Sequence, residues 1–265
     1  MGWPLRGNAA PGHSDILVKF HNRVNRISAR FHIAVQLASH RSPQPNRKAF
    51  LNRATDMSQN EQAYEQLRQA LTTLVYKPGD YLSTASLMDE LALGRTPINH
   101  ALHRLATEGL VQVIPRKGVI VAPLSINDAL ELVDVRMANE ALCMRLAAER
   151  ITKAEVAELK RLAREFDQAA ARRQITDVMN LDRQFHEQIA AAARNQILAE
   201  ILKVLHARSQ RFWAISLAME DHLSEVQVEH QAIIKALAEG NPEASVSAVQ
   251  EHVQSFQRAL LRTGR

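Results

Sequence analysis

The chain has 265 residues, of which 46% are apolar and 23% charged, a balance typical of a globular protein and not of a disordered chain. No apolar run approaches the roughly 20 residues that span a bilayer, which excludes a membrane-spanning helix. The single cysteine, Cys143, excludes an intramolecular disulfide framework and a cysteine-based zinc finger, and it favours a cytoplasmic protein because the cytosol keeps thiols reduced.

The net charge of +5 is concentrated at the N-terminus. Residues 1–56 hold nine Lys/Arg and two Asp/Glu, a local net charge of +7, whereas residues 57–124 hold six of each kind. Residues 125–265 hold eighteen basic and twenty acidic residues. The overall charge therefore does not by itself predict nucleic-acid binding.

Residues 1–58 are predicted to be a basic extension that is poorly ordered, and three interpretations of it stay open. It is an arm that contacts DNA phosphates, or an organelle transit peptide, which it resembles in being arginine-rich and acid-poor but not in its low serine content. The third interpretation is an extension from a start codon assigned too early, because Met57 directly precedes the first well-patterned helix. We favour the third.

A small domain is predicted over residues 59–124. Apolar residues recur at helical spacing in its first half, where Pro78-Gly79 breaks the first helix. Thr96 is the expected N-cap of the third helix, with Pro97 as its first residue. The predicted helices cover 61–76, 84–91 and 97–108, and two β-rich runs at 111–114 and 119–121 flank a basic tip. This order predicts a winged helix-turn-helix with a small β-hairpin wing.

The third predicted helix has a polar face with the chemistry of a DNA reader. Arg95 can contact a phosphate or the O6 and N7 atoms of guanine, and Asn99 can pair with adenine. Lys117, beside Gly118, is placed to contact the DNA backbone or the minor groove. The expected DNA-contacting residues are Arg95, Thr96, Asn99, His103, Arg104, Lys117 and Gly118. On pattern alone, the alternative that this face only meets water stays open.

Residues 64–123 resemble the DNA-binding domain of the GntR family of bacterial transcription regulators. The matching pieces are Leu67-Arg68, Pro78-Gly79, Leu82, Leu87, Leu91, Arg95-Thr96-Pro97-Ile98, Ala101-Leu102, Arg104-Leu105, Glu108-Gly109-Leu110-Val111 and Lys117-Gly118. Two positions depart, because Gly94 stands where the family usually has Ser and Asn99 where it usually has Arg. The family's usual operator contacts therefore do not carry over at Asn99. The resemblance implies a homodimer on double-stranded operator DNA, since one recognition helix reads only a half-site.

Residues 125–265 predict an all-helical bundle of six or seven helices, so the fold class is mainly α. Ser125 and Thr152 each begin a helix, the second with Glu155 in a capping box. Asn195 and Gly240 are expected helix stops. After the helices that begin at Ser125 and Thr152, the predicted helices cover 176–194, 197–217, 224–239 and 242–262.

Four residues on three of these helices form a candidate metal site. Asp182 and His186 are i and i+4 on one helix, and His230 and His252 lie on the apolar faces of the last two helices. A carboxylate and three imidazoles suit a divalent ion such as Zn²⁺, Ni²⁺ or Mn²⁺. By spacing alone, each residue is more often part of a surface pair or a hydrogen-bonded core histidine. Two further histidines that spacing does not exclude are His206 and His222.

This part resembles the FCD domain, which follows the winged helix in the FadR subfamily of the GntR family. The matching pieces are Asp182-x-x-x-His186, Ala192 to Asn195, His230 to Ala236, His252 and Arg136-x-x-x-Glu140. The resemblance implies that Asp182, His186, His230 and His252 hold a metal ion. It also implies that a small carboxylate bridges the metal and Arg136, with Arg136 and Asn195 as ligand-binding residues. Without the resemblance, an internal ion pair between Arg136 and Glu140 is favoured.

Together these features predict a cytoplasmic, non-enzymatic transcription regulator that senses a small organic acid. One alternative is a metal-dependent enzyme that uses the Asp/His₃ site; we disfavour it because no candidate general base stands beside the ligands in the sequence. The other alternative is a DNA-binding protein with a purely structural metal, which senses nothing.

Overall fold

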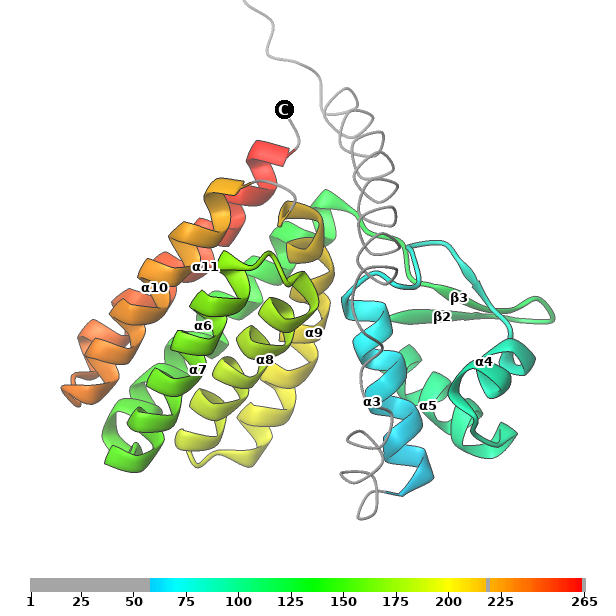
Figure 1. Cartoon of the computed structure of the whole chain (residues 1–265), viewed down its shortest axis with the longest axis horizontal. Coiled ribbons are helices and arrows are strands. Elements are labelled where there is room, and N and C mark those ends of the chain that lie inside the picture. The colour runs from blue at the N-terminus through cyan, green and yellow to red at the C-terminus, as the bar shows by residue number, and fades with distance from the viewer. Residues whose placement is uncertain (1–57, 218–219, 264–265) are drawn as a thin grey trace, which may run out of the picture.

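The computed structural model describes residues 58–217 and 220–263, which form nine helices and one small sheet. Figure 1 shows two parts side by side: a winged helix, made of α3–α5 and strands β1–β3, and a helical bundle, made of α6–α11. The predicted mainly α fold class is confirmed. The basic extension predicted for residues 1–58 lies outside the described residues, apart from Ser58.

The winged helix contains three helices in its first 50 residues. Their bounds are Gln59–Thr72 for α3, Thr84–Leu91 for α4 and Arg95–Thr107 for α5. The hydroxyl of Ser58 accepts a hydrogen bond from the backbone of Glu61 and so caps α3, while Ser83 caps α4 in the same way. These caps satisfy donors that have no partner within a helix.

The start of α5 differs from the prediction. Gly94, not Thr96, is its N-cap, and no side chain caps this helix. The carbonyl of Gly94 accepts the hydrogen bond from the Ile98 backbone, which places Thr96 and Pro97 inside the first turn. Pro97 fits there because the backbone nitrogens of a first turn have no partner within the helix. The predicted N-cap at Thr96 was therefore wrong by two residues.

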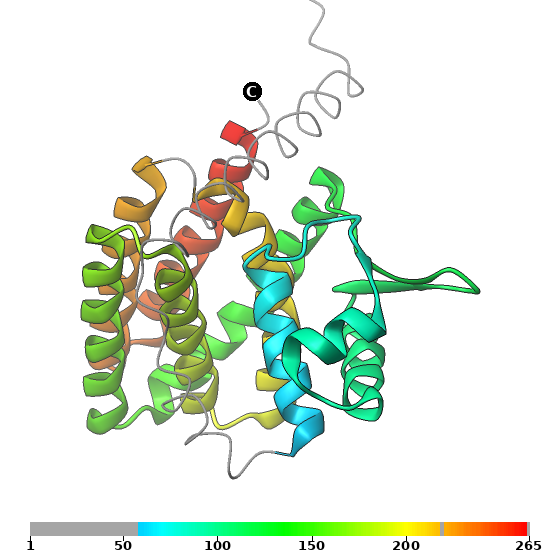
Figure 2. The ribbon, with the colours of Figure 1, turned by 45° about the vertical axis from the view of Figure 1, so that its right-hand side comes forward.

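Three antiparallel strands form the sheet. Their bounds are Tyr81–Leu82 for β1, Val111–Ile114 for β2 and Gly118–Val121 for β3. Strand β3 lies between the other two, with Val119 opposite both Leu82 and Val113. The β2–β3 hairpin is the predicted wing and extends away from the helices (Figure 2). Strand β1 was not predicted, because two residues give no periodic pattern.

The helical bundle contains six helices within the described residues. They are α6 (Ile126–Arg150), α7 (Lys153–Ala171), α8 (Ile175–Ala192), α9 (Gln196–Ser216), α10 (Glu220–Ala238) and α11 (Pro242–Thr263). The caps at Ser125 and Thr152 are confirmed, the latter as a complete capping box with Glu155. Gly240 ends α10 with a φ of +61°. No described helix is long and apolar enough to cross a membrane.

Helix α9 belongs to both parts of the molecule. Its residue Ala207 is 1% exposed and packs in the core of the winged helix with Leu67, Leu71 and Leu105. Farther along the same helix, Phe212 and Trp213 pack in the core of the bundle. The two cores therefore meet across α9, so a movement of this helix disturbs packing on both sides.

Candidate functional site

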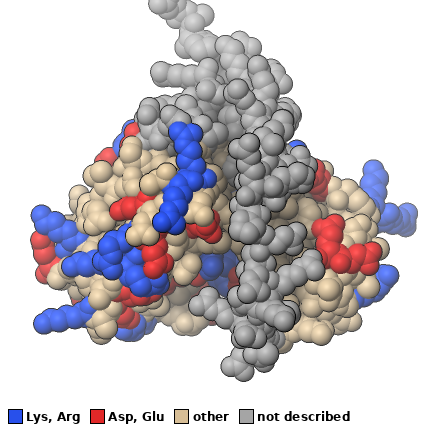
Figure 3. Space-filling model, in the orientation of Figure 1, with Lys and Arg blue, Asp and Glu red and all other residues tan. Residues whose placement is uncertain are grey.

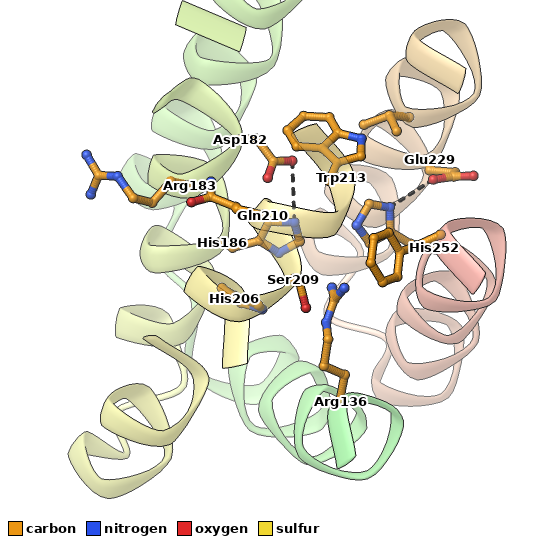
Figure 4. Close-up of a pocket in the computed structure, with 12 residues that line it drawn as sticks. Arg136, Asp182, Arg183, His186, His206, Ser209, Gln210, Trp213, Glu229 and His252 are labelled. Carbon is orange, nitrogen blue, oxygen red and sulfur yellow. Dashed lines mark hydrogen bonds and ion pairs between the residues drawn. The ribbon is translucent and has the colours of Figure 1, made fainter. Parts of the chain in front are cut away.

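A cavity of about 40 Å³ lies inside the bundle, with room for about three water-sized groups. Side chains from α6, α8, α9, α10 and α11 surround it (Figure 4). The polar groups among them include Arg136, Asp182, His186, His206, Ser209 and His252. Five helices thus converge on a small polar space within an otherwise apolar core.

Three of the four predicted metal ligands, Asp182, His186 and His252, line this cavity, and His230 lies next to them. Ring nitrogens of His186, His230 and His252 lie within 4.8 Å of one another. The Oδ1 atom of Asp182 is 3.6 Å from Nε2 of His186 and 3.4 Å from Nε2 of His230. Ligand atoms around a tetrahedral ion with bonds of 2.0–2.1 Å are separated by about 3.4 Å. The three ring nitrogens are therefore close enough to share one ion, and the Asp182 carboxylate lies beside two of these histidines.

Burial sets the protonation states of this cluster. It lowers the pKa of His186 well below its ordinary value, against the opposing effect of Asp182, and it also lowers the pKa of His230. Burial alone would raise the pKa of Asp182, but His186 and His230 hold it below its ordinary value. Neutral imidazoles beside an ionised carboxylate are the forms that bind a metal ion.

Two further features show that these side chains fit a metal ion. Among the described residues, Nδ1 of His230 is buried without a hydrogen-bond partner, and Nε2 has only the 3.4 Å contact with Asp182. Such an arrangement costs free energy unless a ligand takes one of these nitrogens. Nδ1 of His252 lies 2.8 Å from Oε2 of Glu229, as the dashed line in Figure 4 marks. This contact orients the ring and leaves Nε2 of His252 for an ion.

His206 forms part of a second, neighbouring cluster. A ligand atom of His206, one of His186 and one of Glu140 lie within 4.8 Å of one another. Glu140, however, also contacts Nε of Arg136 at 2.6 Å. Although burial alone would raise the pKa of Glu140, Arg136 and His206 hold it well below its usual range. Its charge is therefore already balanced by a cation of the protein. The side chain of the other alternative, His222, is outside the described residues.

Arg136 is both an ion-pair partner and a cavity residue. Its Nε donates to Glu140, as the i, i+4 spacing indicated, and its guanidinium lies over the ring of Phe256 at 5.3 Å. The two Nη groups have no hydrogen-bond partner among the described residues, and Arg136 lines the cavity. Figure 4 shows its guanidinium close to Ser209 and His252. An ion pair with Glu140 and a contact with a carboxylate ligand are thus compatible roles for Arg136, because Glu140 occupies only one edge of the guanidinium.

Several residues that line the cavity were not predicted from the sequence. Four residues of α9 line the cavity: His206, Ser209, Gln210 and Trp213. Their spacing of i, i+3, i+4 and i+7 places them on one face of a helix, a pattern that the sequence alone could have revealed. The hydroxyl of Ser209 is buried without a hydrogen-bond partner in the described chain. Glu229, which orients His252, had no such signal, because its role depends on a residue in the next helix.

Asn195, the other predicted ligand-binding residue, does not line this cavity. Its Oδ1 accepts a hydrogen bond from the backbone of Leu198 at 3.1 Å and caps α9. The preceding residue, Arg194, ends α8 with a φ of +52°. Asn195 therefore begins a helix, where the sequence analysis expected it to end one, and its side-chain oxygen has a structural role.

The exposed surface of the winged helix carries most of the predicted DNA-contacting residues. Arg95, Thr96, Asn99 and His103 are exposed along α5. Lys117 is exposed at the tip of the β2–β3 hairpin, where Figure 3 shows Lys and Arg side chains at the edge of the molecule. These groups form one polar surface with a basic projection.

Arg104, another residue of the predicted set, also has contacts inside the protein, and its predicted DNA contact stays untested. Its guanidinium lies 3.4 Å from the centre of the Tyr64 ring, and its nitrogens contact Glu61 at 2.9 Å and Glu108 at 3.4 Å. Tyr64 and Glu61 hold Arg104 against α3, while Glu108 pairs with it within α5. The residue is therefore part of the packing between α3 and α5. The sequence did not indicate this, because its partners on α3, Glu61 and Tyr64, are 40 or more positions away.

Gly118 also has an internal role. Its φ is +108°, and a Cβ added there would lie 2.6 Å from the hydroxyl of Tyr81. The close approach that requires glycine is thus that of Tyr81 of the neighbouring strand. The prediction of a direct DNA contact at Gly118 stays untested.

Comparisons with known proteins agree with both parts of the fold. Residues 59–121 match the family "Bacterial regulatory proteins, gntR family", and residues 131–255 match the family "FCD domain". The chain is 27% identical over 204 residues to the HTH-type transcriptional repressor RspR of Escherichia coli (strain K12), which covers 76% of this chain and 88% of RspR.

A shorter match is closer in sequence. The chain is 37% identical over 134 residues to an uncharacterized HTH-type transcriptional regulator of Agrobacterium vitis, covering 49% of this chain and 78% of that protein. In three dimensions it is similar to E. coli McbR/YncC, with a TM-score of 0.72 and 24% identity over 78% of this chain and 98% of the other. The chain therefore belongs to the GntR family of bacterial regulatory proteins, as a DNA-binding, ligand-responsive transcription regulator with an FCD domain and not an enzyme.

Proposed function

We propose that this regulator binds operator DNA as a homodimer and that a small carboxylate, bound beside a divalent metal ion in the bundle, controls that binding. The observation that carries the proposal is the position of α9. One face of this helix lines the cavity with His206, Ser209 and Trp213, and another face holds the winged helix through Ala207 and Arg208. A ligand in the cavity therefore contacts the helix that supports the DNA-binding part.

Asp182, His186, His230 and His252 are the residues that would hold the ion. An ion bound there supplies positive charge and open coordination positions for a ligand oxygen. We prefer this set to Glu140, His186 and His206, because Glu140 is neutralised by Arg136. His252 is in addition oriented by Glu229.

The chain's own groups favour an anionic, oxygen-rich effector. The Nη groups of Arg136 suit a carboxylate, which accepts two parallel hydrogen bonds from a guanidinium. The unpartnered hydroxyl of Ser209 offers a further donor or acceptor at the same cavity. The small volume restricts the effector to a compact molecule, or requires the helices to move apart on binding.

A metal analysis tests the ion-binding set. His230→Ala should lose the stoichiometric metal found by elemental analysis after dialysis, because it removes a buried ligand. The matched variant His206→Ala should keep it. Full retention by His230→Ala together with loss by His206→Ala would instead assign the metal to the cluster of Glu140, His186 and His206.

Thermal unfolding with a panel of small carboxylic acids tests the effector. An acid at a hundred times its Kd should stabilise the metal-loaded protein by about 2.7 kcal/mol. Arg136→Gln should lose this response, whereas Arg164→Gln, at an exposed position on α7, should keep it. An absence of any response in metal-loaded wild-type protein would favour a purely structural metal.

The DNA surface is expected at α5 and the wing. Arg95, Thr96, Asn99 and His103 project from the helix that enters the major groove in this type of fold, with Lys117 on the wing beside it. A single winged helix reads only a half-site, which supports a homodimer as the functional unit.

A further inference from the structure

Helix α6 has an exposed stripe that the bundle does not use. Glu131, Val135, Ala138, Leu142 and Arg145 are all exposed and follow one another at spacings of 4, 3, 4 and 3 residues. Val135 is 46% exposed and Leu142 45%. We refer to these five residues as the α6 stripe. Apolar residues at this alternating spacing are the pattern with which one helix packs along another.

The opposite face of α6 already packs inside the bundle. Ala129, Val133, Met144 and Ala147 of that face are at most 3% exposed and belong to the bundle core. The apolar centre of the α6 stripe is therefore additional to the residues that the fold needs. A second helix with matching charges at its ends would cover it.

The charges of the α6 stripe are complementary to themselves. Glu131 lies seven residues before Ala138 and Arg145 seven residues after it. Neither makes an ion pair with another residue in the described part of the chain. If two copies of α6 pack antiparallel about a two-fold axis at Ala138, each Glu131 lies opposite Arg145 of the other copy. Such a two-fold contact uses the same surface on both chains, and it pairs Glu131 and Arg145 of each chain with the opposite charge of the other.

The alternative register is unfavourable. A two-fold axis at position 140 would place Glu131 opposite Glu149 of the other copy, since both are nine residues from that point. Like charges opposite each other oppose association. The register centred on Ala138 instead places Glu149 opposite the neutral Asn127, and the small side chain of Ala138 allows the two helix axes to approach to about 8 Å.

We propose that the α6 stripe is the surface on which a second copy of this chain docks, with the two α6 helices antiparallel and crossing at Ala138. This inference rests on the proposed homodimer and assigns its interface. Ile126, the first residue of α6, follows the winged helix directly and lies twelve residues before Ala138. At 1.5 Å per residue, the two Ile126 residues are about 36 Å apart along the helix pair. That separation matches the spacing of about 34–36 Å between half-sites one DNA turn apart.

Charge reversal tests the interface in the full-length, metal-loaded protein. Arg145→Glu and Glu131→Arg should each raise the dimer Kd measured by sedimentation equilibrium about tenfold or more, because each places two like-charge pairs in the dimer. The double variant with both changes should return the Kd towards the wild-type value. Arg164→Glu, an exposed reversal on α7, should leave the Kd unchanged. Single variants that dimerise like wild type, or a double variant that is not rescued, would overturn the assignment.

A cross-link tests the axis independently of charge. Ala138→Cys should form a covalent dimer on mild oxidation, because a residue at the axis faces its own copy within the range of a disulfide. The exposed α7 control Ala157→Cys should remain monomeric on a non-reducing gel. Operator binding measured on the same samples distinguishes a failure of the proposed dimer from a failure of the proposed α6 interface. A wild-type monomer that binds its operator contradicts the dimer itself, whereas a dimer unaffected by every variant contradicts only the α6 stripe.

Discussion

Nε of Arg208 donates a hydrogen bond to the main-chain oxygen of Glu108 at a distance of 2.8 Å. Glu108 is the C-cap of α5, and Ser209, the next residue after Arg208, lines the cavity in the bundle. Two consecutive residues of α9 thus contact the DNA-binding part and the candidate effector site. A rotation of α9 about its axis would change both contacts together.

Further contacts between the two parts surround this hydrogen bond. Lys203 of α9 pairs with Glu65 of α3 at 3.0 Å. Arg68 of α3 lies 3.5 Å from Glu187, which directly follows His186 in α8. The guanidinium of Arg211 also donates to the main-chain oxygen of Ala122, and burial lowers its pKa to about 10. The winged helix is therefore held by the two helices that supply much of the candidate site.

Arg208→Ala should uncouple the two parts. Without the hydrogen bond to Glu108, the ratio of operator affinities with and without the bound acid should fall towards one, from a typical coupling of about 1–3 kcal/mol. Fluorescence anisotropy with labelled operator measures the ratio. Arg164→Ala serves as the control, and an unchanged ratio in Arg208→Ala would remove this contact from the coupling.

Arg95→Ala should weaken operator binding by about 1–3 kcal/mol if the side chain contacts a base. Arg95 is exposed at the start of α5, the helix that we propose enters the major groove. The same titration at several salt concentrations distinguishes a base contact from a phosphate contact, which changes the salt slope by about one unit. Equal affinity of the variant and the wild type would exclude Arg95 from the interface.

Arg104→Ala should affect stability and not operator specificity. The variant loses the contact with the Tyr64 ring and two partly exposed ion pairs, so we expect the free energy of unfolding to fall by about 1 kcal/mol. Urea unfolding measures this change, and competition with non-operator DNA measures specificity. A loss of specificity at unchanged stability would instead support a DNA contact by Arg104.

Cys143 should be unreactive in the folded protein. Burial raises the pKa of its thiol to about 12, so the thiolate needed for reaction is scarce at pH 8. A colorimetric thiol reagent should label it only after unfolding. Because the folded pKa is the higher one, the stability linked to this thiol is fully present below the unfolded pKa of about 8.5 and is lost as the pH rises towards 12. Rapid labelling of native protein would contradict this burial.

Local signals in the sequence predicted much of the fold. The bounds of α4 and the capping box at Thr152 follow from residues within one helical turn, and the clustering of Asp182, His186, His230 and His252 follows from the family resemblance. Contacts between distant segments were not accessible in this way. The contacts of Arg104 depend on α3, and the place of Ala207 in the winged-helix core depends on how the two parts dock.

The two incorrect helix caps have a similar cause. Thr96 and Asn195 are both residue types that cap helices and fill turns. The choice between neighbouring positions depends on backbone conformation, and the extended Gly94 and the left-handed Arg194 decide it. A single sequence does not specify these dihedral angles.

The most direct test of the account is operator binding as a function of the state of the metal site. Purified protein would be titrated on operator DNA selected from its own and neighbouring upstream regions, with excess competitor DNA present. The account predicts that one small carboxylate changes the affinity of the metal-loaded wild type and has no effect after the metal is stripped or in His230→Ala. The same operator affinity in all of these states, with and without every acid, would contradict it.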